Sequence, residues 1–79
     1  MKHAREDYNN RIIDIDGIIP EDEPVFLLRG QDVFAPAALR YWAQLMIDKK
    51  QYEMAKLALE HADKMDSWQK EIKHKIADL

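Results

Sequence analysis

The chain has 79 residues, of which 47% are hydrophobic and 34% are charged, and 15 acidic residues against 12 basic ones give a net charge of -3. This mixture is typical of one small globular domain and excludes a disordered tail and an integral membrane protein. The absence of cysteine excludes disulfides, thiolate nucleophiles and cysteine-ligated zinc. Because a domain this short buries only about 60% of the surface of its unfolded chain, we expect a homo-oligomer.

Charge is distributed unevenly along the chain. Residues 1–32 carry a net charge of -4 and residues 33–79 a net charge of +1. This asymmetry is too small to indicate a nucleic-acid partner. The first twenty residues are interrupted by charges, so neither a signal peptide nor a spanning helix fits them. Together with the lack of cysteine, this predicts a cytoplasmic protein that makes no membrane contact.

The N-terminal third is expected to be irregular or to contain short strands. Residues 1–11 are a polar arm, either frayed or a short helix, and residues 12–32 are an irregular or strand-containing segment. Within that segment, isoleucines around Asp16-Gly17 favour a strand and a turn. The apolar run Val25–Leu28 is consistent with a short buried strand or one helical turn, and periodicity does not decide between them.

From residue 33 onward the pattern is helical. Apolar residues recur every three or four positions over about 36–48, 51–64 and 66–78, which predicts three helices. Asp66, with Gln69 three positions later, is the capping pair from which the third helix is expected to begin. Connections of two to four residues force neighbouring helices to run antiparallel. The sequence therefore predicts a mainly α-helical single domain, spanning residues 1–79, with a three-helix antiparallel bundle as its core over 33–79.

The pair of helices over residues 36–64 resembles a single tetratricopeptide-repeat hairpin. The residues that carry the resemblance are Leu39, Trp42, Ala43, Met46, Tyr52, Ala55, Leu59 and Ala62. Two positions depart from the motif: Lys50 replaces the usual turn glycine and Ser67 stands where a proline is expected. Repeat proteins need about three units to bury a continuous core, and only one is present. The resemblance therefore implies a helical hairpin but no peptide-binding groove, and the stripe to which Trp42 belongs predicts that its side chain lies in the core.

Three stretches are similar to small uncharacterised proteins encoded by tailed bacteriophages and prophages. They are Pro20–Asp32 (PEDEPVFLLRGQD), Phe34–Pro36 (FAP) and Arg40–Ala43 (RYWA). The resemblance implies a viral accessory protein that acts in the bacterial host cytoplasm, by binding rather than by turnover, and it transfers no specific activity.

The residue inventory argues against catalysis and against a metal or another cofactor. Ser67 is the only serine, threonine and cysteine are absent, and the three histidines are too far apart in the sequence to form a ligand pair. The lysines of the last helix are interrupted by acidic residues, so nucleic-acid binding is not expected either. We therefore predict that the protein is not an enzyme.

One constellation has the chemistry of a ligand site. Arg29, Gln31, Arg40 and Tyr41 flank the junction between the apolar run and the first long helix. Arginine offers a bidentate fork for phosphate or carboxylate, glutamine offers an amide edge, and tyrosine offers a stacking face. Glycine at position 30 would permit close backbone approach. A second set of residues is expected at an oligomer or partner interface, because their apolar side chains offer more surface than a small monomer can cover. These residues are Phe34, Met54, Leu57 and Trp68.

These observations lead to two functional hypotheses. The first is a non-catalytic phage accessory protein that binds a host or phage protein through the apolar and acidic surface of its N-terminal segment. The alternative is an oligomeric sponge that sequesters a signalling nucleotide, such as a cyclic nucleotide, of an antiviral defence pathway.

Overall fold

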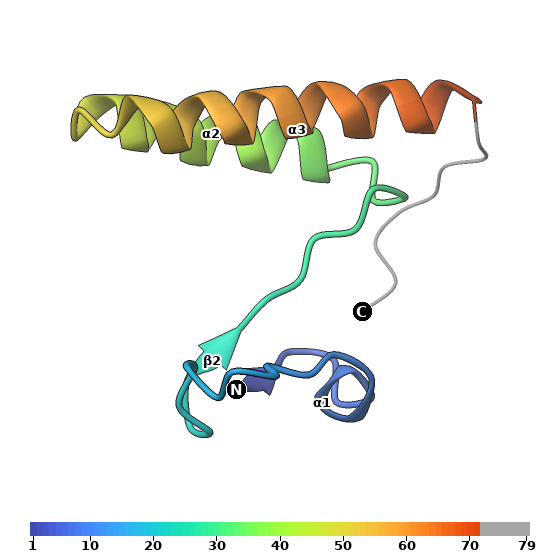
Figure 1. Ribbon diagram of the computed structural model, residues 1–79. Helices are drawn as coiled ribbons and strands as arrows, with labels where there is room; N and C mark the ends of the chain where they lie inside the picture. The colour runs from blue at the N-terminus through green and yellow to red at the C-terminus, as the bar shows by residue number, and fades with distance from the viewer. Residues whose placement is uncertain (72–79) are drawn as a thin grey trace.

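The structure, a computed structural model, describes residues 1–71 of the chain. Its elements follow in the order β1 (Lys2–His3), α1 (Tyr8–Arg11), β2 (Pro24–Val25), α2 (Ala35–Asp48) and α3 (Tyr52–Glu71). The two long helices lie side by side as a hairpin, and the short strands and α1 form a separate N-terminal unit below it (Figure 1). The prediction of a mainly helical chain with a helical hairpin and a short-strand N-terminal third is confirmed.

Local sequence signals set both ends of α2. At its start, the Asp32 carboxylate accepts a hydrogen bond from the Phe34 amide at 2.8 Å, and Pro36 occupies the first turn, where a missing N–H costs nothing. At its end, Lys50 donates to the Ile47 carbonyl and Gln51 to the Met46 carbonyl, both at 2.8 Å. This is the Schellman pattern, which requires a left-handed residue, and Lys50 has a φ of 61°. A lysine thus adopts the conformation for which the related motif uses glycine.

The third helix does not begin at Asp66. α3 continues through that residue to Glu71 as one helix of 20 residues, so the expected break at residue 65 is wrong. Neither proline nor glycine interrupts this stretch, and a capping pattern alone does not stop a helix whose backbone hydrogen bonds can continue. The Asp66 carboxylate instead accepts a hydrogen bond from Arg40 on α2. The remainder of the expected third helix, 72–78, lies outside the described residues.

Alanine forms the contact between α2 and α3. The residues buried between them are Ala43, Ala55 and Ala58, with Met46 and Ile47 packed at the edge, and Ala62 is also fully buried on α3. Small side chains let the two helix axes approach closely, but they bury little apolar area. Within residues 1–71 no large side chain is fully buried. Trp42 is 41% exposed, so its predicted position in the core is wrong.

The N-terminal unit is held together by a two-stranded sheet and by one tyrosine. β1 and β2 pair in parallel, with Lys2 opposite Pro24 and His3 opposite Val25. Tyr8 is buried, with the guanidinium carbons of Arg5 and Arg11 at 4.8 and 5.4 Å from its ring centroid.

The two arginines that flank this ring also share a carboxylate. Arg5 donates to Asp7 at 2.6 Å and Arg11 donates to it at 2.9 Å. These hydrogen bonds, the one from Arg5 first, hold the pKa of the Asp7 carboxyl below its ordinary value. The cluster therefore combines cation–π contacts with ion pairs at the surface of α1.

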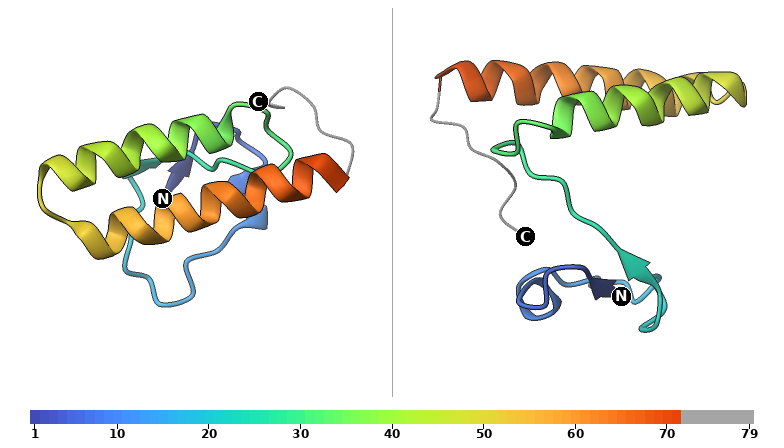
Figure 2. Two further views of the ribbon diagram at one scale, coloured as in Figure 1. Left: turned by 90° about the horizontal axis from the view of Figure 1, so that it is seen from above. Right: turned by 180° about the vertical axis from the view of Figure 1, so that it is seen from behind.

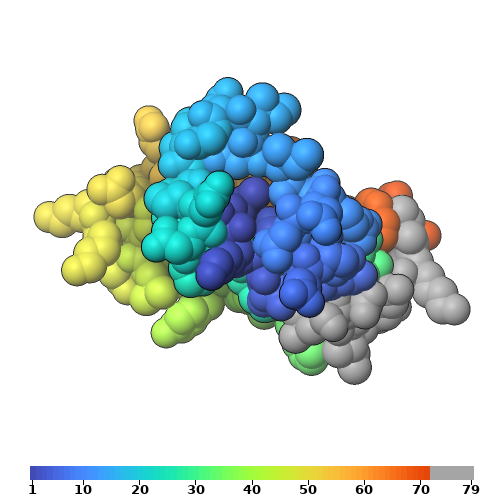
Figure 3. All heavy atoms as spheres, turned by 90° about the horizontal axis from the view of Figure 1, so that it is seen from below, coloured from blue at the N-terminus to red at the C-terminus, as the bar shows by residue number. Residues whose placement is uncertain are grey.

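An extended linker separates the N-terminal unit from the hairpin. Residues 26–29 form neither strand nor helix, and Phe26 and Leu27 are exposed, so the buried strand or helical turn expected at 25–28 is limited to Pro24–Val25. Within residues 1–71, no element of the N-terminal unit packs against α2 or α3. Figure 2 shows this linker running between the two layers. Seen from below, the N-terminal unit lies in front of the hairpin, whose closed end projects beyond it (Figure 3).

Replacing Lys50 by glycine should stabilise the hairpin. The left-handed conformation costs an L-residue with a Cβ about 1–2 kcal/mol, part of which glycine loses again through its greater backbone freedom. We expect the free energy of unfolding to rise by about 0.5–1 kcal/mol and the melting temperature by a few degrees, measured by circular dichroism at one protein concentration. Lys49→Gly, at a φ of -96°, is the control and should destabilise. Equal effects of the two substitutions would contradict the assignment of the left-handed position.

Candidate functional site

A tight turn connects the linker to α2 and is fixed by one side chain from α3. The Asp32 amide donates to the Arg29 carbonyl at 3.0 Å and closes the turn. The Gln69 side-chain amide donates to the Gly30 carbonyl at 2.8 Å and to the Asp32 carbonyl at 2.7 Å. These two hydrogen bonds join Gln69 to residues that lie 39 and 37 positions earlier in the sequence. They hold the turn against the last part of α3.

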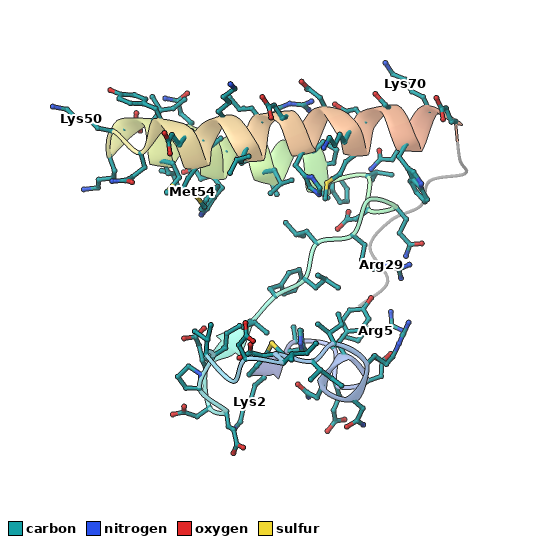
Figure 4. The ribbon with its side chains drawn as sticks, in the orientation of Figure 1. Lys2, Arg5, Arg29, Lys50, Met54 and Lys70 are labelled. Carbon is teal, nitrogen blue, oxygen red and sulfur yellow. The ribbon has the colours of Figure 1, made fainter. Side chains whose placement is uncertain are left out.

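Beside this turn lies an open pocket of about 310 Å³. It is lined by the turn and by one face of α3: Arg29, Gly30, Gln31, His61, Lys64, Met65 and Trp68. On the helix the lining residues fall at intervals of three, one and three, which places them on one side. Figure 4 shows Arg29 below the hairpin, whereas Lys70 points away from α3 on the opposite side.

The pocket is cationic. Arg29 and Lys64 line it with His61, and among the described residues none of the three takes part in an ion pair. Asp32 follows the turn, but its carboxylate is buried and accepts the Phe34 amide. No carboxylate is among the lining residues. Two permanent positive charges therefore face the opening.

The pocket also has an apolar side. Met65 is buried at its base, and Trp68 remains 41% exposed, so part of its indole ring can be reached from solvent. A Cβ placed on Gly30 would lie 3.8 Å from Trp68 Cε3, an ordinary van der Waals distance. The close approach expected of Gly30 is therefore not required by its contacts with these side chains.

The structure brings together only half of the predicted ligand residues. Arg29 and Gln31 line the pocket, whereas Arg40 donates to Asp63 at 2.9 Å and to Asp66 at 2.5 Å. These hydrogen bonds, the one to Asp66 first, raise the pKa of Arg40 above its ordinary value and neutralise its charge locally. Tyr41 lies outside this pocket and lines an apolar one on α2.

The residues predicted for an interface are all exposed, and three of them line two adjoining hollows. Trp68 lines the cationic pocket, and Met54 and Leu57 line a neighbouring groove between α2 and α3. Phe34 precedes α2 and lines neither hollow. His61 and Lys64 line both the groove and the cationic pocket, so the two adjoin. Figure 4 shows Met54 on the side of α3 that faces the N-terminal unit.

Sequence reasoning missed three lining residues: His61, Lys64 and Met65. A helical signal was present, because positions 61, 64, 65 and 68 share one face of a helix. These positions are far from Arg29 in the sequence, so no local pattern links them to it. The Gln69 side chain holds the turn against this face of α3.

Comparison with protein-family models, curated proteins and solved structures finds no match to the chain. The resemblance to phage proteins therefore stays a prediction. Residues 1–71 contain no group of three or more His, Cys, Asp or Glu side chains arranged to hold a metal ion. Across the same part of the chain, no helix has the length and apolar character needed to cross a membrane.

Replacing Gln69 should loosen the turn that forms the pocket. Gln69→Leu removes two hydrogen bonds and leaves the Gly30 and Asp32 carbonyls without them, so we expect the free energy of unfolding in urea to fall by about 1–3 kcal/mol. Gln44→Leu is the matched control, because Gln44 makes a single exposed hydrogen bond to Asp48 at 3.2 Å. Its effect should stay within about 0.5 kcal/mol. Similar losses for both variants would refute the role of Gln69.

Proposed function

We propose that the chain is a non-catalytic binding protein that holds a nucleotide in the pocket between the Arg29–Asp32 turn and α3. The observation that carries the proposal is the lining of that pocket: Arg29 and Lys64, which form no ion pair within residues 1–71, lie beside an accessible indole ring. Phosphate binds to such cations, and a nucleobase stacks on such a ring.

Each group of the pocket has a distinct part in this proposal. The planar Arg29 guanidinium can donate two parallel hydrogen bonds to a phosphate, and Lys64 supplies a second positive charge from α3. The Gln31 amide can both donate to and accept from a base edge. Trp68 provides the stacking face. The volume of about 310 Å³ is at the small end of the range for ligand sites, which suits part of a nucleotide better than a folded partner.

Retention rather than turnover is proposed because the pocket lining has no hydroxyl, thiol or carboxylate group. It includes no Ser, Thr, Cys, Asp or Glu, so it offers no carboxylate ligand for the magnesium ions that bridge the phosphates in phosphoryl transfer. With the resemblance to phage proteins, the proposed role is a sponge that removes a signalling nucleotide of an antiviral defence pathway. A sponge is effective when its concentration is high and its dissociation constant for the nucleotide is low, and it needs no catalytic turnover.

Removing a pocket cation should weaken nucleotide binding. We expect calorimetry with cyclic dinucleotides, cyclic trinucleotides and adenosine-diphosphate-ribose to give at least one binder for the unmodified protein. Arg29→Ala and Lys64→Ala should each weaken that binder about ten- to a hundredfold, because a charge-assisted hydrogen bond contributes about 1.5–3 kcal/mol. Lys70→Ala removes a cation on the opposite side of the same helix and should leave the affinity unchanged. No heat with any of these ligands would overturn the proposal.

A second candidate function uses a different surface. Residues 13–18 carry three isoleucines, Ile13, Ile15 and Ile18, that are exposed in the structure, and Ile15 is 92% exposed. The loop turns at Gly17, with a φ of 63°, and the Ile19 amide donates to Asp14 at 2.6 Å, so it has a defined shape. Apolar side chains at the tip of a loop with acidic neighbours are typical of a protein-binding site. We propose a host or phage protein as the partner of this loop.

A charge placed at the tip of the Ile13–Ile18 loop should abolish partner binding and leave nucleotide binding unchanged. Ile15→Asp is expected to prevent cross-linking of the loop to a partner in bacterial lysate and to weaken binding of the purified partner at least tenfold, while nucleotide binding is unchanged. Glu21→Gln is the control for a change of charge in the same unit. If Ile15→Asp and the unmodified protein retained the partner equally, the loop would not be the binding surface.

A further inference from the structure

Helix α2 is apolar on two faces, yet the described part of the chain covers only one of them. The face toward α3 buries Ala43 and packs Met46 and Ile47. A second apolar face is exposed, with Tyr41 at 70% and Leu45 at 47%, and Phe34 at 61% precedes it. A helix that is apolar nearly all round is normally buried on more than one side.

The second face has the spacing of a helix–helix seam. Phe34, Ala38, Tyr41 and Leu45 follow one another at intervals of four, three and four residues, the repeat of residues that meet a neighbouring helix. Three of them, Ala38, Tyr41 and Leu45, line an open and almost entirely apolar groove of about 470 Å³, which Leu28 of the linker borders on one side. The groove shares no residue with the cationic pocket.

We propose that a second copy of the chain covers this face, with the two α2 helices antiparallel about a two-fold axis between Leu39 and Arg40. In this register Tyr41 of each copy lies opposite Ala38 of the other, and Phe34 lies opposite Leu45. A large side chain meets a small one at the centre of the seam, which lets both helices approach and interdigitate. A two-fold interface must be self-complementary in this way.

The accessible surface area of the chain also supports a second copy as the occupant of this face of α2. Its accessible surface is 6417 Å², whereas about 5000 Å² is expected for a compact monomer of 9.3 kDa. The radius of gyration, 14.0 Å, also exceeds the roughly 11.6 Å expected for 79 residues. A stable dimer covers about 800 Å² on each partner, so one such interface takes up much of this excess. Arg40 points away from the seam and pairs with Asp63 and Asp66 on α3. Asp48, three residues after Leu45, lies at the end of the seam, where a carboxylate can remain in water.

Sedimentation equilibrium without any nucleotide tests the interface. The unmodified chain is expected to show twice the monomer mass at micromolar concentration. Tyr41→Glu should weaken dimerisation at least a hundredfold, because it places a charge at the centre of the seam, while circular dichroism stays unchanged. Leu57→Glu is the matched control, an equally exposed apolar residue on α3, and should leave the dimer intact. A monomer mass at 200 µM, or a dimer broken by Leu57→Glu and not by Tyr41→Glu, would overturn the proposal.

Cysteine cross-linking tests the register, and the absence of native cysteine makes the result unambiguous. A mixture of Ala38→Cys and Tyr41→Cys chains should form the mixed disulfide faster than either chain forms a disulfide with itself. Faster cross-linking within each variant alone would indicate a parallel pair and would refute the antiparallel arrangement.

Discussion

The alanine contact between α2 and α3 is the constraint on which the rest of the structure depends. Ala43, Ala55, Ala58 and Ala62 let the two helices lie close together, but each contributes little apolar burial. The larger apolar side chains are consequently left on the outside of the hairpin. A chain of this length without disulfides gains its remaining stability from what covers those side chains.

The outward side chains divide into surfaces of different chemistry. On α3, His61, Lys64 and Trp68 combine charge with an aromatic ring, which suits a charged planar ligand. On α2, Tyr41 and Leu45 border a groove without charge, which suits a second helix. The pocket and the groove share no residue, so the proposed ligand binding and the proposed self-association would not compete for the same surface.

Gln69 couples the linker to the hairpin and so creates the pocket. Its side chain donates to the Gly30 and Asp32 carbonyls, and the Asp32 carboxylate accepts a hydrogen bond from the amide of Phe34, the residue before α2. The turn that presents Arg29 is thus fixed at both ends by polar contacts. Within residues 1–71, no helix or strand of the N-terminal unit packs against α2 or α3, so the Ile13–Ile18 loop belongs to a part of the fold separate from the pocket.

Local sequence signals were sufficient to predict the helical hairpin and the turn at Gly17, because periodicity and turn chemistry depend on neighbouring residues alone. They also pointed to Arg29 and Gln31, which the structure places in the lining of the pocket. Tertiary structure alone decided that α3 continues through Asp66, since the pairing of that carboxylate with Arg40 joins residues 26 positions apart. The tertiary structure also pairs Arg40 with acidic residues of α3, outside the pocket, and places His61 and Lys64 in the pocket lining. The turn packs against α3 through Gln69, a contact that no local pattern encodes.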